Sequence, residues 1–288
     1  MGASTQAPRA FVIGWPIAHS RSPLIHNYWL NTLGLPGSYE RVAVPPETLA
    51  EFLNNFARED FVGGNVTLPH KEAAFALCAE TSARANPLKA VNTLWMESGK
   101  LHGDNTDVAG FLASLDADVP AWAERCEKAV IIGAGGAARA IVSALMSRCR
   151  CRMTLVNRSP ARGAELIALV HAIDPAQVIE LHDFSALPQC LAGADLLVNT
   201  TSLGMTNQPP LVIDLALLPA HALVADIVYV PLETELLAAA RKRGLKTSGG
   251  LGMLLHQAVP GFARWFGAVP DVTPELRALV ARNIMGES

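Results

Sequence analysis

The segment Lys128-Ala-Val-Ile-Ile-Gly133-Ala-Gly135-Gly136-Ala-Ala-Arg139 leads from a short apolar strand through a glycine turn into a helix. Glycine permits the tight turn and lets a phosphate approach main-chain N–H groups, while the N-terminus of the helix favours the anion. The usual third glycine is replaced by Ala138, which is small enough for close helix–sheet contact. A plain tight turn is the alternative, but the strand before it and the helix after it favour a dinucleotide-binding turn. The residues expected there are Gly133, Ala134, Gly135, Gly136 and Ala137.

The next expected strand, at residues 153–157, indicates which dinucleotide is bound. NAD-binding proteins normally end this strand with Asp or Glu, which accepts hydrogen bonds from the ribose 2′-hydroxyl. Here the strand ends in Asn157-Arg158-Ser159-Pro160-Ala161-Arg162, which contains no carboxylate. Two guanidinium groups and a hydroxyl suit a 2′-phosphate. An ordinary solvated loop would explain the arginines alone, but beside the glycine turn they predict NADP, held by Asn157, Arg158, Ser159 and Arg162.

Short apolar runs alternate with helix-period segments along most of the chain, which predicts an α/β fold with parallel strands. A length of 288 residues predicts about two domains, at roughly 150 residues each. We expect a Rossmann-like NADP-binding domain at 111–250. A second α/β domain is expected at 1–110, completed by C-terminal helices at 251–288, with a cleft between the two. Expected strands are 10–14, 39–44, 61–67, 90–95, 129–133, 153–157, 196–199 and 223–226. Expected helices are 23–33, 47–56, 136–147 and 233–242.

Composition and charge exclude several classes of partner. The formal net charge is −3 and aromatic residues make up 6% of the chain, so neither nucleic acid nor an anionic membrane is expected. Five cysteines without C-x-x-C spacing predict reduced thiols in a cytoplasmic protein and no metal. Within this set, Cys149-Arg150-Cys151 is too closely spaced for a zinc site and is expected to end a helix and begin a strand. The sequence leaves a monomer and a homodimer open.

Polar residues gather in three segments of the first domain. Gly14-Trp-Pro-Ile-Ala-His19-Ser20-Arg21-Ser22-Pro23 follows a strand and opens a helix, with Ser22 expected at the N-cap. A capped helix alone would account for these residues, but Ser20, Ser22 and the helix end could together hold a carboxylate. The histidines of these segments lack metal-ligand spacing, so structural roles are expected for His19, His26 and His70.

The other two segments place amide, hydroxyl and ammonium groups at strand ends. Asn65-Val-Thr67-Leu-Pro-His-Lys71 ends one expected strand, and Asn92-Thr93 lies at the end of another. The C-terminal ends of parallel strands are where open α/β sheets collect ligands. Gly103-Asp-Asn-Thr-Asp107 then caps a helix and puts Asp107 in its first turn. These groups are expected to converge on one site.

Taken in order, these motifs resemble the shikimate dehydrogenase family. The matching segments are GxPxxHSxSPxxHN (14–27), NVTxPHK (65–71), AVNT (90–93), GDNTD (103–107), GAGGAAR (133–139), NRSPAR (157–162), NTTSLGM (199–205), DIVY (226–229) and GGLGMLLHQA (249–258). The resemblance spans nearly the whole chain. It implies that the first domain binds substrate and that the chain reduces 3-dehydroshikimate to shikimate with NADPH, in the pathway to chorismate and aromatic amino acids.

The resemblance also implies roles for individual residues. Ser20 and Ser22 would bind the substrate carboxylate, and Tyr229 would lie near the substrate. The ring hydroxyls would contact Asn65, Thr67, Asn92, Asp107 and Gln257. Lys71 and Asp107 would form the catalytic pair, with Lys71 as proton donor or as an electrostatic group. The loop containing Thr201 would lie beside the cofactor, with Gly250 and Met253 near the nicotinamide.

Two other functions stay open at this point. The first is a dehydrogenase for quinate or another cyclic hydroxy acid with the same fold. Ser22, where quinate-preferring relatives tend to carry Thr, and the missing ribose-binding acid near Arg158 favour shikimate. The second is a non-enzymatic module that binds NADP. NADP binding alone would not require Lys71, Asp107, Asn92 and Gln257, so their presence favours an enzyme.

Overall fold

The computed structural model describes residues 7–287, and the chain divides into two compact units. Residues 1–6 and 288 fall within the expected domain ranges but lie outside the described part. The first unit contains the chain up to Thr106 together with Gln257–Val280. The second contains Asp107–His256 and the residues from Ala281 onwards. Across residues 7–287, no helix combines the length and apolar character that a membrane-spanning segment needs.

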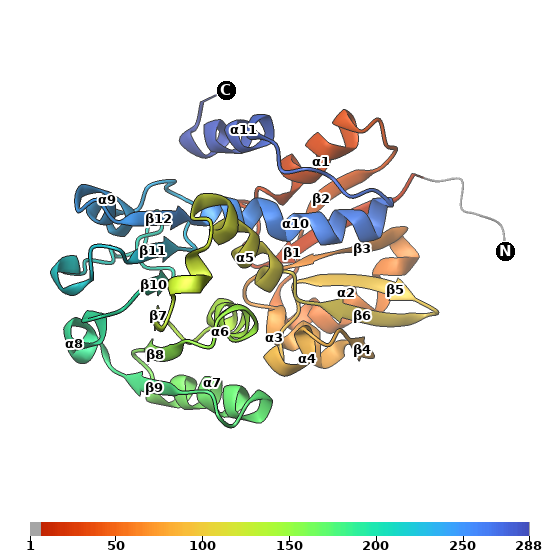
Figure 1. The fold of residues 1–288 in the computed structure, drawn as a ribbon. Helices are drawn as coiled ribbons and strands as arrows, with labels where there is room; N and C mark the ends of the chain where they lie inside the picture. Colours follow the sequence, from red (N-terminus) through yellow and green to blue (C-terminus); the bar gives the residue numbers. More distant parts are fainter. Residues whose placement is uncertain (1–6, 288) are drawn as a thin grey trace. The chain divides into compact units, whose positions relative to one another are not determined.

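The first unit is built on a six-stranded mixed sheet with the order β2-β1-β3-β5-β6-β4 (Figure 1). Its strands are β1 Arg9–Gly14, β2 Ser38–Ala43, β3 Phe61–Val66, β4 Glu80–Thr81, β5 Thr93–Glu97 and β6 Lys100–Asp104. Strands β1, β2 and β3 are parallel, as expected from the sequence, and β4 is parallel to β6. Strand β5, however, runs antiparallel to both of its neighbours.

The antiparallel pair β5 and β6 corrects the expectation of parallel strands throughout. Only Ser98 and Gly99 separate the two strands, and both have positive φ angles, 52° and 75°. Positive φ at both central residues is the geometry of a tight two-residue hairpin. Such a short connection can join only antiparallel strands, because a parallel pair needs a crossover of about a dozen residues or more. Strand β6 was not predicted from the sequence at all.

Helices and an aromatic core complete the first unit. Phe11 of β1 makes edge-on contacts with the rings of Phe52, Phe56 and Phe61 at centroid distances of 5.1–5.3 Å. Edge-to-face packing of this kind adds about 0.5–1.5 kcal/mol per pair beyond the burial of area. The helices are α1 Ser22–Thr32, α2 Leu49–Asn55, α3 Lys71–Leu77 and α4 Ala85–Leu88, with the short 3-10 turns η1 Pro46–Thr48 and η2 Phe56–Glu59. Helices α10 Gly250–Phe266 and α11 Pro274–Met285 belong partly to this unit and partly to the second.

The second unit contains an entirely parallel six-stranded sheet with the order β12-β11-β10-β7-β8-β9 (Figure 1). Its strands are β7 Lys128–Ile132, β8 Arg152–Val156, β9 Ile179–His182, β10 Leu196–Asn199, β11 Leu223–Asp226 and β12 Lys246–Gly249. Strands β9 and β12 were not predicted. The Rossmann-like expectation is confirmed, because the strand order reverses between β7 and β10, where doubly wound sheets bind dinucleotides.

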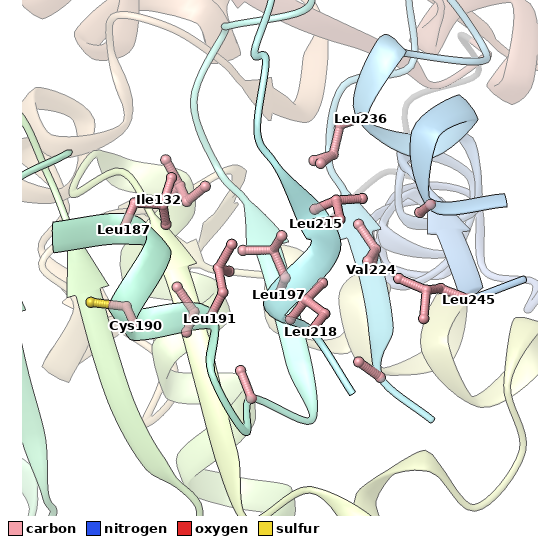
Figure 2. Close-up of a cluster of buried hydrophobic side chains, with 14 of the residues drawn as sticks. Ile132, Leu187, Cys190, Leu191, Leu197, Leu215, Leu218, Val224, Leu236 and Leu245 are labelled. Atoms are coloured by element: carbon pink, nitrogen blue, oxygen red, sulfur yellow. The ribbon is translucent and has the colours of Figure 1, made fainter. Parts of the chain in front are cut away.

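Leucine-rich packing holds the second unit together. Figure 2 shows Leu197 of β10 and Val224 of β11 among leucines from the surrounding helices and turns. Each buried leucine contributes about 1.5–3 kcal/mol through removal of its surface from water. The helices are α5 Asp107–Asp118, α6 Gly136–Arg148, α7 Pro160–Ile173, α8 Leu187–Leu191 and α9 Glu235–Lys242, with the 3-10 turns η3 Trp122–Arg125, η4 Phe184–Ala186 and η5 Leu215–Leu217.

Candidate active site

One edge of the first sheet gathers the polar residues of the first unit. Strands β1, β3 and β6 end at this edge, and β5 begins there, since Ile13 pairs with Val66, Asn65 with Thr93 and Thr93 with Asp104. Asn92 was expected at the end of a parallel strand but immediately precedes the antiparallel β5. Reversal of the strand direction therefore brings Asn92 to the same edge as the residues that follow β3.

Ser20 lies in the loop between β1 and α1, Ser22 is the first residue of α1, and both are buried. Ser22 was expected at the N-cap of the helix, but Arg21 occupies that position and Ser22 is the first helical residue. The side chain of Ser20 instead accepts a hydrogen bond from the Ser22 amide at 3.3 Å. The guanidinium of Arg41 fixes the loop by donating to the Ser20 carbonyl oxygen at 2.6 and 2.9 Å. The two hydroxyls thus lie where this constrained loop meets the start of α1.

A buried amide network joins Asn65, Asn92 and Gln257. The Asn65 amide donates to the Asn92 carbonyl oxygen at 2.9 Å. The Asn92 amide donates to Thr106 Oγ1 at 3.0 Å and to Gln257 Oε1 at 3.3 Å. The Thr106 hydroxyl in turn donates to the Gln257 main-chain oxygen at 2.8 Å. The structure therefore brings three residues expected to contact the substrate into one network, although Gln257 is more than 150 positions from the others.

Tyr39 belongs to this network and was not singled out from the sequence. Its hydroxyl donates to Asn65 Oδ1 at 2.6 Å. Burial raises the pKa of Tyr39 well above its ordinary value, so the hydroxyl keeps its proton and remains a donor. His26 stacks on the Tyr39 ring at a centroid distance of 4.0 Å. No motif marks Tyr39, because it lies inside β2, where a tyrosine is an ordinary strand residue.

Lys71 is the first residue of α3, directly after the turn that follows β3. The backbone there is held on both sides: the Lys71 carbonyl oxygen accepts from the Val91 amide at 3.0 Å, and His70 Nε2 lies 2.7 Å from the Val44 carbonyl oxygen. Lys71 is half-buried, as is Thr67 at the other end of the turn. The side chain of Lys71 thus starts from a fixed position at the site edge, and His70 has the structural role expected of it.

Asp107 directly follows Thr106 and begins α5, in the first turn as expected. Its side chain is buried, with 5% of its surface exposed. Lys71 belongs to the first unit, whereas Asp107 is assigned to the second. Their pairing stays a prediction, as does the position of Tyr229 and Met253, two half-buried residues of the second unit, next to substrate and nicotinamide.

The glycine turn of the second unit lies at the end of β7, before α6. Gly133 has a φ of +108°, a backbone conformation that residues with a side chain rarely adopt. A Cβ at this position would also lie 2.6 Å from Thr200 Oγ1. A Cβ on Gly135 or Gly136 would meet no atom within 4 Å, so these two face open space at the helix N-terminus. This open backbone next to a helix N-terminus fits the pyrophosphate of a dinucleotide.

Residues 157–159 connect β8 to α7, and Arg162 lies in the first turn of α7. Asn157 donates from its side chain to the Ser159 carbonyl oxygen at 2.8 Å, and Ser159 occupies the N-cap of α7. Arg158 and Arg162 are exposed on either side of this N-cap. Both arginines are thus close to a helix N-terminus along the chain, and their binding of a 2′-phosphate stays a prediction.

Asn199 and Asp226 form a second polar network that the sequence analysis did not assign. Asn199 donates to Asp226 Oδ1 at 2.9 Å, and the Thr234 hydroxyl donates to Asp226 Oδ2 at 2.7 Å. Burial raises the pKa of Asp226. Asn199 Oδ1 also accepts from the amide and hydroxyl of Thr201, at 3.0 and 2.7 Å. The network therefore holds the loop after β10 in place. Asn199, Thr201 and Asp226 belong to the motifs at 199–205 and 226–229, which could have indicated this network from the sequence.

Gly250 begins α10 and was expected beside the nicotinamide. A Cβ at this position would overlap the carbonyl oxygen of Ile227. The Gly250 amide also donates to the Val228 carbonyl oxygen at 3.3 Å. Close approach of two backbone segments is thus sufficient reason for glycine here, and its contact with the cofactor stays a prediction.

Comparison with known proteins finds relatives along most of the chain. Three family models match in order along the chain. They are the shikimate dehydrogenase substrate binding domain at residues 12–94, shikimate / quinate 5-dehydrogenase at 121–216 and the shikimate 5′-dehydrogenase C-terminal domain at 250–279. A shikimate dehydrogenase (NADP(+)) of Methylocella silvestris is 62% identical over 96% of this chain and 97% of its own length. A relative of the same name from Methylobacterium radiotolerans is 54% identical over 98% of this chain and all of its own length.

Two solved structures resemble this chain over nearly its full length. Shikimate 5-dehydrogenase from Thermus thermophilus, in complex with NADP(H) and shikimate, is 36% identical with a TM-score of 0.81, and the match covers 96% of this chain and 99% of the other. Quinate dehydrogenase from Corynebacterium glutamicum, in complex with NAD, is 30% identical with a TM-score of 0.88 and the same coverage. The fold alone therefore does not separate shikimate from quinate or NADP from NAD.

Proposed function

This chain belongs to the shikimate dehydrogenase family, and we propose that its first unit holds the substrate at the edge formed by β1, β3, β5 and β6. It catalyses the reversible NADP-dependent reduction of 3-dehydroshikimate to shikimate. The observation that carries the proposed site is the buried network of Asn65, Asn92 and Gln257. Amide groups held by several hydrogen bonds each are fixed in orientation, which suits recognition of a ring with several hydroxyls.

Within this site, Ser20 and Ser22 bind the substrate carboxylate. Arg41 fixes the backbone at Ser20 through its carbonyl oxygen, and Ser22 begins α1, so little backbone freedom is lost on binding. Asn65, Thr67, Asn92, Asp107 and Gln257 contact the ring hydroxyls. Tyr229, from the loop after β11, completes the substrate contacts.

Lys71 and Asp107 assist the proton transfer. NADPH, when bound, supplies the hydride to the substrate ketone, whose oxygen then gains negative charge. The ammonium of Lys71 donates a proton or a charge-assisted hydrogen bond to that oxygen. Asp107 holds the ammonium in position and accepts a hydrogen bond from a neighbouring ring hydroxyl. In the reverse direction the same groups accept the proton.

The second unit binds NADP through two features. The pyrophosphate lies against Gly133, Ala134, Gly135, Gly136 and Ala137, where a helix N-terminus and open backbone are available. Asn157, Arg158, Ser159 and Arg162 clamp the 2′-phosphate, and Thr201, Gly250 and Met253 lie near the rest of the cofactor. We place the enzyme in the cytoplasm, because all five cysteines are free thiols. We also propose that it acts as a monomer or a homodimer.

A quinate dehydrogenase is the second candidate, supported by the TM-score of 0.88 to the Corynebacterium glutamicum enzyme. Reduced-nicotinamide absorbance, with shikimate and quinate each offered against NADP and NAD, separates the two functions. We expect kcat/KM to be highest for shikimate with NADP. Replacing shikimate by quinate, or NADP by NAD, should each lower it by at least about tenfold. Equal or faster turnover of quinate would assign the chain to the second function, and no turnover of any pair would leave only a binding module.

A further inference from the structure

Three of the five cysteines meet at one end of the second sheet, away from the site described above. The sulfur atoms of Cys126, Cys149 and Cys151 all lie within 4.8 Å of one another, and all three residues are buried. Cys126 ends η3, Cys149 follows the last turn of α6 and Cys151 directly precedes β8. From the sequence, only the spacing of Cys149 and Cys151 was considered, and it was judged too tight for zinc. Cys126, more than twenty positions earlier, supplies the missing third thiol.

Backbone hydrogen bonds fix the position of each cysteine before any ligand binds. The Cys149 amide donates to the Leu145 carbonyl oxygen at 2.8 Å, which anchors it to α6. The Cys151 carbonyl oxygen accepts from the Gln177 side chain at 2.8 Å. The starts of β7 and β8 are paired next to the cluster, because the Arg152 amide donates to the Glu127 carbonyl oxygen at 2.8 Å. The cluster is therefore built from the rigid elements of the sheet.

The three thiols also face one another. With metal–sulfur bonds of about 2.3 Å, a trigonal site needs sulfur atoms about 4.0 Å apart. The observed arrangement thus requires only small movements to reach the geometry of a trigonal metal centre.

Arginine residues flank each cysteine of the cluster along the chain. The sequence alternates arginine and cysteine at Arg148-Cys149-Arg150-Cys151-Arg152, and Arg125 precedes Cys126. These arginines are exposed, and Arg148 pairs with Asp116 at 2.9 Å. The acidic neighbours are Glu124 and Glu127, on either side of Arg125 and Cys126. These guanidinium groups could offset part of the negative charge of metal-bound thiolates.

We propose that Cys126, Cys149 and Cys151 form a binding site for one soft, thiophilic metal ion, with Cu(I) as the fitting class. No histidine or carboxylate completes the group among residues 7–287, so three sulfur ligands are available. Zinc in proteins is almost always four-coordinate, and the burial of these sulfurs leaves little room for water as a fourth ligand. Soft thiolates select Cu(I), which accepts three of them. The ion joins the end of α6 to the starts of β7 and β8.

The test is an anaerobic titration of the fully reduced chain with Cu(I) against a chromogenic Cu(I) chelator. We expect one ion per chain and thiolate-to-copper absorbance in the ultraviolet. Cys126→Ser, Cys149→Ser and Cys151→Ser should each weaken binding by at least about 100-fold, beyond the roughly 10- to 100-fold typical for loss of an outer-shell partner. Cys190→Ser is the matched control, since Cys190 is a buried cysteine in the leucine core of the same unit (Figure 2). It should bind like the parent chain.

Two further measurements keep the result independent of folding. The Cys→Ala variants, checked by circular dichroism, retain the apolar character of the site and should lose binding to the same extent. Copper should raise the melting temperature of the parent and Cys190→Ser chains but not of the cluster variants, because a ligand bound only to the folded state stabilises it. Absence of one-to-one binding, an equal loss in Cys190→Ser, or zinc binding as tight as copper would each overturn the proposal. Dehydrogenase activity plays no part in these readouts, so they are separate from the tests of the proposed function.

Discussion

The residues proposed to bind the substrate and those proposed to bind the cofactor differ in burial and in hydrogen bonding. On the substrate side, Asn65, Asn92 and Gln257 are buried and already hydrogen-bonded to one another. On the cofactor side, Arg158 and Arg162 are exposed around a helix N-terminus. Buried amides discriminate by geometry, because an incorrect ligand leaves polar groups without partners. Exposed cations discriminate by charge, with a contribution that salt weakens.

The largest effect is expected from removal of the positive charge of Lys71 at the substrate edge. Lys71→Met keeps the length of the side chain but removes the ammonium, so kcat should fall by about 100- to 10,000-fold, the typical contribution of a positioned acid–base group. The KM for shikimate should change by less than about fivefold. Steady-state kinetics measures both values. Lys242→Met, at an exposed position of α9, is the control. A kcat within a few-fold of the parent value would remove Lys71 from the mechanism.

The next effect concerns the exposed arginines and is limited to one cofactor. In each of the single variants Arg158→Ala and Arg162→Ala, the KM for NADPH should rise by about 10- to 100-fold, because a hydrogen bond to a charged group contributes about 1.5–3 kcal/mol. The KM for NADH should hardly change, since NADH lacks the 2′-phosphate. Arg152→Ala, at the opposite end of β8, provides the control. An equal rise in KM for NADPH and NADH would show that neither guanidinium binds the 2′-phosphate.

The comparison becomes sharper when stability is measured alongside catalysis. Asn92→Ala removes the amide that donates to Thr106 Oγ1 and to Gln257 Oε1, which should cost about 1–3 kcal/mol in unfolding free energy. Arg158→Ala should stay within about 0.5 kcal/mol of the parent chain, as exposed substitutions usually do. Urea denaturation of both variants tests this difference. Equal losses of unfolding free energy in Asn92→Ala and Arg158→Ala would contradict the proposed difference between the buried amides and the exposed arginines.

A further effect is a pH dependence of stability that comes from the buried His26. Burial lowers the pKa of His26 from 6.5 to about 3, so the folded state excludes a proton that the unfolded state binds. The stability from neutral His26 is complete above pH 6.5 and is lost as the pH falls toward 3, at about 1.4 kcal/mol per pH unit. His26→Phe, which can stack on Tyr39 in the same place, should reduce this slope by up to one proton. Urea unfolding at pH 7.5, 5.5 and 4.5 measures it, and identical slopes in parent and variant would refute the assignment.

Local sequence patterns were sufficient for much of the fold and of the cofactor site. The helix at 136–147 and the strands at 129–133 and 153–157 agree with α6, β7 and β8 to within a residue. Phosphate-binding turns depend on neighbouring residues of one segment, so their residues can be recognised in order along the chain. The residue-by-residue substrate roles came instead from resemblance to a family.

The errors arose where strand direction or distant partners decide the outcome. Asn92 reaches the site edge only because β5 runs antiparallel, and β6 was missed because its turn, Ser98-Gly99, is short and ordinary in composition. Tyr39 joins the amide network through β2 without any motif to mark it.

The amino-acid sequence by itself determined the α/β class, the glycine turn, the preference for NADP and the family, because these depend on residue types at fixed spacing. Only the tertiary structure decided the mixed sheet, the joining of Asn92 to Gln257 and the meeting of Cys126 with Cys149 and Cys151. The physical reason is distance along the chain. Packing of the folded elements brings these side chains together, and no local spacing encodes that contact.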